Sequence, residues 1–358
     1  MAVAKGSVLV AMSGGVDSSV AACLLHEQGY EAVGAHMNLV HLDGVEHGCC
    51  GPRARADAAE VARIAGFPFE IVDLSAEFEW EVVDDFLAEH EAGRTPNPCA
   101  RCNGGIKFGA FLRLAVERGF DHVATGHYVR TLHEGGSWRL VRGVDRSKDQ
   151  TYMLHMLGQR ELSRSLFPIG ALAKSETRAI AVRFGLPVAT KPDSQELCFA
   201  PAGDAGGFVR DHAPALVRAG EVVDVERRVL GEHDGTFAFT VGQRRGLGVA
   251  LGTPAYVVSV DAAANRVVVG PQELLARRGL VADRASWVAG GPPGGGPFEA
   301  EVRIRYRGED APAVVTPRGD TFEVEFRTPQ RAVAPGQSAV VYRGDELLGG
   351  GRIVEARR

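Results

Sequence analysis

The residues best suited to phosphate chemistry form the stretch Ser13-Gly14-Gly15-Val16-Asp17-Ser18-Ser19, which follows an apolar run and leads into a helix-like run. Its glycines let the backbone approach an anion closely, and its serines add amide hydrogens and hydroxyls at a helix N-terminus. Asp17 adds a carboxylate that could hold Mg²⁺ beside the phosphates. The chain contains no Gly-Lys-Ser/Thr, which excludes a kinase-type P-loop. The stretch therefore predicts a nucleotide-phosphate site, with an ordinary serine-capped turn as the alternative.

Cysteine chemistry is the second candidate, in the segment Gly93–Asn103. Its glycine and two prolines predict a loop, and it contains Cys99-x-x-Cys102. A thioredoxin-like redox pair would need a matching βαβ context, which the surrounding pattern lacks. A structural zinc would need a second spaced pair, whereas Cys49 and Cys50 are adjacent. The pattern favours a third interpretation, a nucleophilic thiol on a mobile loop.

Two observations favour reactive thiols over structural ones. Cations lower a thiol pKa from its free value of about 8.5, and three lie close to this motif in sequence: Arg94, Arg101 and Lys107. Cys198 lies in a second irregular segment, Lys191–Phe199. A lone cysteine is most often a buried structural residue, but the polar residues before Cys198 favour partial exposure.

The hydrophobic pattern predicts an α/β scaffold for these candidates. Up to about residue 200, strand-like runs alternate with helical ones, as in a parallel sheet. The predicted strands are 8–12, 32–40, 69–74 and 122–125, and the predicted helices include 54–65, 78–87, 108–118 and 175–184. Short β-branched runs follow at 221–230, 236–241, 255–260, 266–269, 299–306, 313–316, 321–326 and 339–343. They predict a small central β-containing domain and a C-terminal β-barrel, with Gly290–Pro297 as either a domain border or a loop inside the barrel.

Length and composition exclude several classes of protein. The 358 residues are 45% hydrophobic and 24% charged, which predicts a globular chain of two or three domains. No signal-peptide core and no run of eighteen apolar residues occurs, so we expect a soluble, cytoplasmic protein with no membrane partner. The six cysteines lack a secreted disulfide framework. The net charge of −5 argues against a uniformly basic RNA binder, but eleven acidic residues between 56 and 91 give way to ten basic residues between 93 and 148.

The motifs taken together resemble one family. Ser13–Ser19 resembles the PP-loop of the N-type ATP pyrophosphatases, which cleave ATP between the α and β phosphates. With six further motifs in the same order, the chain resembles the bacterial tRNA 2-thiouridylases of the MnmA type. Those motifs are Gly93–Asn103, Gly126-His127-Tyr128, Lys148-Asp149-Gln150, Lys191–Phe199, Gly231–Gly235 and Thr240–Arg244. The last two lie outside the ATP domain and separate this family from other PP-loop enzymes.

The resemblance implies ATP-dependent 2-thiolation of the wobble uridine in the tRNAs for Lys, Glu and Gln. ATP would place AMP on the uracil C2 oxygen while Asp17 and the PP-loop neutralise phosphate charge. Cys198 would carry a persulfide and Cys102 would be the partner nucleophile, leaving a Cys102–Cys198 disulfide after turnover. The implied ATP contacts are Ala11, Met12, Ser13, Gly14, Gly15, Val16, Asp17, Ser18, Met37 and Gly126. The implied contacts with tRNA or its target base are Asn97, Pro98, Cys99, His127, Lys148, Asp149, Gln150, Arg305, Tyr306 and Gln337.

Cys99 departs from the family pattern, since some members carry Asp there. With Cys102 and Cys198 it could instead hold three corners of an iron–sulfur cluster, which is a further hypothesis. The resemblance also implies a cysteine desulfurase or sulfur carrier as partner, and a monomeric enzyme. The implied domains are 1–205, 206–275 and 276–358, and the last two would hold the tRNA. The alternatives are another PP-loop adenylating ligase or amidotransferase, and a non-catalytic RNA-binding module.

Overall fold

The computed structural model describes residues 5–40, 51–193, 197–200, 204–249 and 253–358, so Cys49 and Cys50 lie outside the described residues. Its first part confirms the predicted parallel sheet. Leu9 and Ala11 pack against one hydrophobic cluster and Val8 and Val10 against another, because successive residues of a strand face opposite sides. The strands lie in the order β3-β2-β1-β4-β7: β1 Ser7–Ala11, β2 Glu31–Asn38, β3 Phe69–Asp73, β4 His122–Ala124 and β7 Ser165–Leu166.

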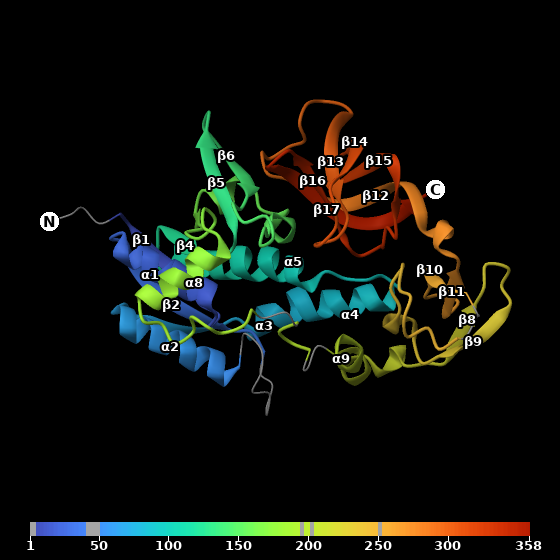
Figure 1. The fold of residues 1–358 in the computed structure, drawn as a ribbon, viewed down its shortest axis with the longest axis horizontal. Coiled ribbons are helices and arrows are strands. Elements are labelled where there is room, and N and C mark those ends of the chain that lie inside the picture. Colours follow the sequence, from blue (N-terminus) through green and yellow to red (C-terminus); the bar gives the residue numbers. More distant parts are fainter. Residues whose placement is uncertain (1–4, 41–50, 194–196, 201–203, 250–252) are drawn as a thin grey trace.

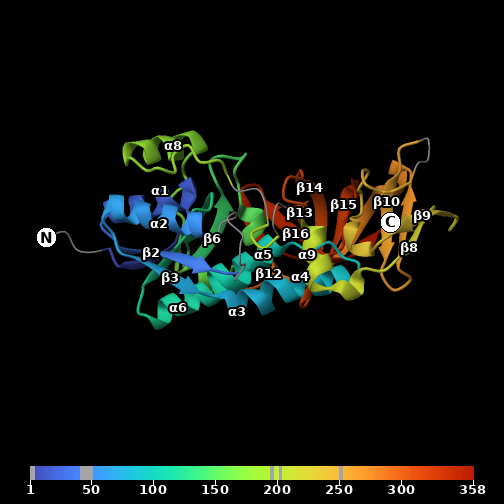
Figure 2. The ribbon, with the colours of Figure 1, turned by 90° about the horizontal axis from the view of Figure 1, so that it is seen from below.

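Three helices cover one face of this sheet (Figures 1 and 2). Each contributes to the same cluster, through Val20, Val61 and Ala181. The second of them starts at a proline and ends at Gly66, whose left-handed conformation is that of a C-cap. The helices are α1 Val16–Glu27, α2 Pro52–Ala65 and α8 Lys174–Arg183.

Two long helices on the other face each contain a π-helical segment. The first joins α3 Ser75–Phe78, the π segment Glu79–Val83 and α4 Asp84–Glu91. The second joins α5 Pro98–Cys102, the π segment Asn103–Ala110 and α6 Phe111–Glu117. The predicted loop at 93–103 is therefore wrong from Pro98 onward. Proline suits the first position of a helix, and the Asn97 side chain accepts a hydrogen bond from the Ala100 amide as its N-cap.

The central part confirms the expected small β domain. Its strand order is β10-β11-β8-β9: β8 Gly220–Val223, β9 Val229–His233, β10 Tyr256–Asp261 and β11 Arg266–Gly270. The strand predicted at 236–241 is wrong, since Thr236–Ala238 forms a 3₁₀ turn. The turn sends Phe237 into the core of the first domain and Phe239 into the central core. Residues two apart on one strand would face the same way, so a strand could not place both side chains.

The C-terminal part is the predicted closed barrel. Its strands follow the order β12-β15-β14-β13-β16-β17, and β12 also pairs with β17, which closes the ring. Gly290–Pro297 connects β12 to β13, so it is a loop inside the barrel rather than a domain border. The strands are β12 Ala276–Trp287, β13 Phe298–Arg303, β14 Ala311–Arg318, β15 Thr321–Arg331, β16 Ser338–Arg343 and β17 Glu346–Arg357.

A hairpin that the hydrophobic pattern does not predict links the first domain to the barrel (Figure 1). It consists of β5 Val129–Glu134 and β6 Ser137–Arg142, and β6 pairs with β17 through Val141 and Glu346. The sheet of the barrel thus continues into the first domain. Short helices complete the fold: Thr151–Leu154, α7 Gln159–Leu162, α9 Ala205–His212, Pro214–Leu216 and Gln272–Leu275. Within the described ranges, no helix combines the length and apolar character needed to cross a membrane.

Candidate active site

The predicted phosphate loop lies at the carboxyl end of β1, where the chain turns into α1. Ligands of open α/β sheets bind at this edge. Gly14 has a φ of +69°, and a Cβ there would lie 2.1 Å from the Ala54 carbonyl oxygen, so this position requires glycine. The Ser13 amide donates a hydrogen bond to the Ser18 hydroxyl at 3.2 Å. The loop is therefore shaped by its own hydrogen bonds and by close contact with α2.

Asp17, in the first turn of α1, is held by groups from two other elements. Lys174, at the start of α8, donates to both oxygens of its carboxylate at 2.7 Å. The Tyr128 hydroxyl donates to the same carboxylate at 2.8 Å. Burial raises the pKa of Tyr128, so the phenol keeps the proton that it donates. The carboxylate predicted for phosphate chemistry thus faces an ammonium group.

Asp193 brings further cations to this pair. Its carboxylate lies 2.8 Å from the Lys174 ammonium, 2.9 Å from that of Lys148 and 3.3 Å from the Arg178 guanidinium. Burial by itself would raise the pKa of Asp193, but hydrogen bonds from Lys174 and Lys148 hold that pKa below its usual value. Asp193 is therefore a carboxylate that holds a group of basic side chains together.

These basic side chains suit the triphosphate of ATP, because ammonium groups and loop amides are the donors that bind phosphate oxygens. Lys191 reaches the loop directly: its ammonium donates to the Gly14 carbonyl at 2.9 Å and pairs with Asp57 at 2.5 Å. The sequence alone does not reveal the role of these basic side chains. Two of them stood in motifs singled out for other reasons, and the others carried no signal. They are Lys148, Lys174, Arg178 and Lys191.

Mg²⁺ and an iron–sulfur cluster fit these residues differently. Asp17 offers the carboxylate that Mg²⁺ takes together with phosphate oxygens and water, although an ion there would compete with Lys174. For a cluster, the part of the chain that the structure describes contains no group of three or more His, Cys, Asp or Glu able to hold a metal. Among the described residues, Cys99, Cys102 and Cys198 do not form such a group, so the structure gives no support to the cluster hypothesis.

The other implied ATP contacts support the loop from the sheet. A Cβ on Gly126 would lie 2.5 Å from the Ser18 amide nitrogen, so its glycine lets the end of β4 meet the loop. Ala11 and Met12 are buried at the end of β1. Met37, in β2, packs against the core of the first domain. Side chains in such positions shape the sheet edge.

Cys102 and Cys198, far apart in sequence, share one hydrophobic cluster. Cys102 ends α5 and is 8% exposed, and Cys198 packs against the same cluster. The reason is Phe199, a buried residue whose ring contacts the rings of Phe78 and Phe86 edge-on. These two rings anchor the segment that carries Cys198 on the first long helix. Cys99, by contrast, is exposed.

The cations next to the cysteine motif are themselves paired. Arg94 lies 2.6 Å from Glu89, and Arg101 lies 2.5 Å from Glu81. The acidic run at 56–91 and the basic run that follows it therefore neutralise one another in part inside the protein. An ion-paired guanidinium exerts a weaker field on a neighbouring thiol, so Arg94 and Arg101 give less support than expected for a lowered thiol pKa.

Family comparisons place each part of the fold. A family described as tRNA methyl transferase HUP domain matches residues 6–202, and one described as tRNA methyl transferase PRC-barrel domain matches residues 206–271. A third, described as aminomethyltransferase beta-barrel domain, matches residues 277–353. The first match alone covers more than half of the chain, and the three correspond to the parallel sheet, the central β domain and the closed barrel.

Curated relatives match nearly the whole chain. A protein of Roseiflexus sp. (strain RS-1) is 45% identical over 97% of this chain and 98% of its own length, and it is named tRNA-specific 2-thiouridylase MnmA. The chain belongs to the MnmA family of tRNA-specific 2-thiouridylases. Members from Acidothermus cellulolyticus (47% identical, 98% of both chains) and Chloroflexus aurantiacus (48% identical, 97% of this chain and 98% of the relative) carry the same name.

The chain is much less similar to solved structures than to these curated relatives. The NMN synthetase from Francisella tularensis is 17% identical, with a TM-score of 0.33, over 53% of this chain and 67% of that chain. A score of this size carries no argument about function.

Several thiouridylase residues implied in tRNA contact face the protein interior in this structure. The Asp149 carboxylate is 5% exposed and accepts from the Thr151 hydroxyl at 2.8 Å. The Gln150 side-chain oxygen accepts from the Tyr128 amide at 2.9 Å. His127 is buried, which lowers its pKa well below the usual value with the help of nearby Lys107, so the ring is neutral. Each of these side chains has a structural contact that sequence reasoning does not reveal.

The implied contacts in the barrel divide into two kinds. Arg305 is exposed, and its guanidinium donates to the Ala332 carbonyl at 3.1 Å. Tyr306 is half-buried, with its ring centroid 6.1 Å from that of Tyr152. These two residues remain accessible at the surface, whereas Gln337 bonds to the loop that precedes the cysteine helix.

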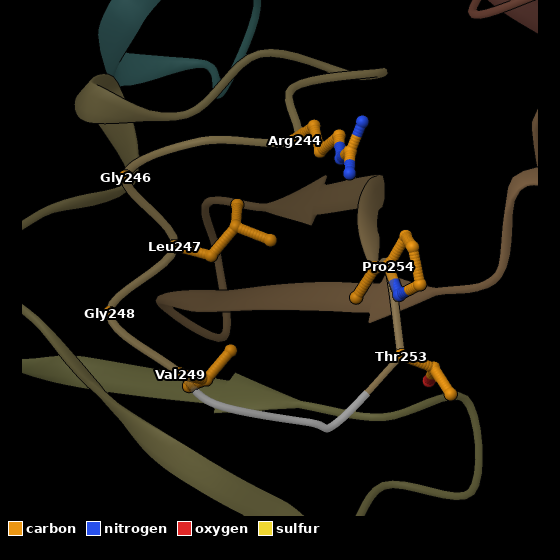
Figure 3. Close-up of a pocket in the computed structure, with 8 residues that line it drawn as sticks. Arg244, Gly246, Leu247, Gly248, Val249, Thr253 and Pro254 are labelled. Atoms are coloured by element: carbon orange, nitrogen blue, oxygen red, sulfur yellow. The ribbon is translucent and has the colours of Figure 1, made fainter.

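A separate cavity of about 510 Å³ lies in the central domain of this thiouridylase (Figure 3). Leu247 and Val249 form its apolar side, and Arg244 and Thr253 supply polar groups. The motif Thr240–Arg244 singled out in the sequence thus ends at this cavity. None of its lining residues belongs to the phosphate loop or to the cysteine motif.

Proposed function

We propose that this protein thiolates C2 of the wobble uridine in the tRNAs for Lys, Glu and Gln, at the cost of one ATP. The observation that carries the proposal is the presence, in one domain, of a lysine-lined phosphate loop and of two cysteines that share a cluster. Adenylation alone would need only the loop. The pair of thiols supplies the second half of a sulfur transfer.

The loop serves the activating step. The uracil C2 carbonyl is a poor electrophile, so its oxygen attacks the α phosphorus of ATP, AMP becomes bonded to that oxygen, and pyrophosphate leaves. Charge builds on the phosphate oxygens during this step, and Lys174, Lys191 and the loop amides stabilise it. Mg²⁺ bound with ATP at Asp17 would neutralise further phosphate charge.

The cysteines serve the sulfur step. A cysteine desulfurase or sulfur carrier loads Cys198 with a persulfide. In one order, the terminal sulfur attacks C2 and expels AMP, and the Cys102 thiolate then attacks Sγ of Cys198 to release the 2-thiouridine. In the other, Cys102 first attacks Sγ and releases hydrosulfide, which then attacks C2 and expels AMP. Both orders end with a Cys102–Cys198 disulfide, which a dithiol reductant must reopen.

Domain roles follow from the same proposal. Residues 1–205 activate the uridine and transfer sulfur, while 206–275 and 276–358 hold the tRNA. The target base must leave the anticodon stack to reach the buried Cys102 and the half-buried Cys198, and Asn97, Pro98 and Cys99 lie at the start of the helix that carries Cys102. Binding that rests on phosphate contacts weakens as salt rises, and affinity retained at high salt would contradict a basic tRNA surface.

One reaction tests the function. The protein is incubated with ATP, Mg²⁺, a sulfide source and unmodified tRNA, and the digested nucleosides are analysed by mass. We expect 2-thiouridine at the wobble position and AMP formation that requires tRNA. AMP formation without tRNA, and without a thiolated nucleoside, would instead indicate another adenylating ligase or an amidotransferase.

A further inference from the structure

We propose that Gln337 is a positioning residue that fixes the cysteine helix to the barrel. The inference rests on the proposed function, because it assigns the barrel a part in sulfur transfer. Gln337 lies just before β16, and its side-chain amide donates to the Thr95 carbonyl at 2.9 Å and to the Pro96 carbonyl at 3.1 Å. Both amide hydrogens point at the main chain that leads into α5.

The main chain of the barrel reinforces this contact. The Thr95 amide donates to the Pro335 carbonyl at 2.8 Å. Gly336 has a φ of +93°, and a Cβ there would lie 2.6 Å from the Thr95 carbonyl oxygen, so the barrel and the loop touch backbone to backbone. The Gln337 amide and carbonyl in turn bond to Ala334 and Ile353. The barrel thus offers a rigid surface shaped to the loop.

The start of the cysteine helix α5 is also bonded to the barrel. Asn97 caps α5 by accepting from the Ala100 amide at 3.2 Å, and its own amide donates to the Ser338 hydroxyl at 3.4 Å. The Ser338 hydroxyl also bonds to His155 at 3.0 Å, and its carbonyl accepts from Tyr152. The residue that starts the cysteine helix is therefore tied to the strand next to Gln337, one turn before Cys102.

A third domain joins the same loop. The Thr95 hydroxyl donates to the Thr240 hydroxyl at 3.1 Å, which brings in the central domain. Arg94 and Arg352 both bind the buried carboxylate of Glu89, which ties the other end of the loop to the barrel. All three domains therefore hold residues 94–97, and Gln337 supplies two of the bonds.

This arrangement explains why a barrel residue would matter for thiol chemistry. Nucleophilic attack needs the reacting atoms aligned within a few tenths of an ångström, and a shift of about 1 Å can slow a reaction by roughly a hundredfold. Without Gln337, two loop carbonyls would lose their donors, and the start of α5 would be held less tightly by the remaining contacts. The ATP site lies on other elements and would be unaffected.

Gln337→Leu tests the proposal, with Gln330→Leu as the matched control. Gln330 lies in the same barrel, and its amide donates to the Thr328 carbonyl of its own strand. For Gln337→Leu we expect single-turnover thiolation to fall by about tenfold or more at saturating tRNA, where a change in tRNA affinity has no effect on the rate. Alkylation of Cys102 by iodoacetamide, read by peptide mass analysis, should become faster. Gln330→Leu should match the parent protein in both measurements.

Other results would overturn the proposal. An unchanged single-turnover rate at saturating tRNA would show that Gln337 has no part in sulfur transfer, and an unchanged rate of Cys102 alkylation would show that Gln337 does not hold the helix. The alkylation measurement needs no tRNA, so it decides the question even if the parent protein fails to thiolate tRNA. Should Gln337→Leu not fold, Gln337→Asn keeps the amide but shortens its reach, and the same outcomes apply.

Discussion

Lys174 holds both carboxylate oxygens of Asp17 at 2.7 Å, so the acidic residue of the phosphate loop is paired with a lysine from the other end of the domain. We predict that Lys174→Met lowers the rate of tRNA-dependent pyrophosphate release by on the order of a hundredfold, because a preorganised cation beside the phosphates is lost. Pyrophosphate release under single-turnover conditions measures this effect.

The control for Lys174 lies on the same helix. Arg183 ends α8 and pairs at the surface with Glu27, so Arg183→Met should leave pyrophosphate release unchanged. Equal rates for Lys174→Met and Arg183→Met would remove Lys174 from the activating step.

Cys102→Ser and Cys198→Ser should each abolish 2-thiouridine formation while tRNA-dependent pyrophosphate release continues in a single turnover, because only the sulfur step needs the thiols. Nucleoside mass analysis and pyrophosphate release, measured on the same samples, separate the two steps. Cys23→Ala is the control, since Cys23 lies buried in α1 and burial raises the pKa of its thiol to about 11. Thiolation by both serine variants at the parent rate would refute the assigned chemistry.

Asp149 joins two domains through charge, and its loss should destabilise the protein. Its buried carboxylate lies 3.7 Å from Arg142 of the hairpin and 3.9 Å from Arg303 of the barrel. Removing one partner of a buried ion pair leaves uncompensated charge, which costs about 3 to 5 kcal/mol. Asp149→Ala should therefore lower the midpoint of thermal unfolding by several degrees in a calorimetric scan.

An exposed pair provides the comparison for Asp149. Glu299 pairs with Arg327 at the barrel surface, and such pairs contribute about 0 to 1 kcal/mol. Glu299→Gln should hardly change the unfolding midpoint. If both variants unfolded at the parent temperature, the buried network would not hold the domains together.

Acid should weaken the fold through His155. Burial lowers the pKa of His155 from 6.5 to about 4, so the folded protein binds fewer protons there than the unfolded chain between these values. Its contribution is therefore constant above pH 6.5 and is lost as the pH falls toward 4, by up to about 1.4 kcal/mol per pH unit. Denaturant unfolding at pH 7, 6 and 5 should show a shallower pH slope for His155→Gln than for the parent, and equal slopes would contradict this.

The residues of the phosphate loop could be predicted from the sequence, but the residues that the fold brings to the site from distant parts of the chain could not. Gly14 acts through its backbone and Ser18 through its hydroxyl, so the spacing of these residues predicts a phosphate loop. Lys174 gives no such signal, because a lysine at the start of a helix is ordinary until the fold places it against Asp17. Phe199 is similar: only the packed aromatic cluster reveals why Cys198 lies where it does.

The fold shows the same division. The alternation of apolar runs predicted the parallel sheet, most clearly at the central strand β1, which is a nearly continuous buried hydrophobic segment. The predicted loop before Cys102 missed a helix that depends on the cap from Asn97. The hairpin at 129–142 was missed although its signal is local, because β5 and β6 pair with each other across the two-residue turn Gly135-Gly136. Only the pairing of β6 with β17 is a long-range contact that leaves no local pattern.

The closing strand β17 sets the order in which the protein can become active as it leaves the ribosome. Ile353 bonds to the main chain of Gly336 and Gln337, and the barrel closes only when β17 meets β12. The nucleotide domain is synthesised early, but the contacts that the barrel makes with the loop before the cysteine helix need β17 to have emerged. A nascent chain would then hold its phosphate site before its thiols were set, so sulfur chemistry would await the synthesis of β17.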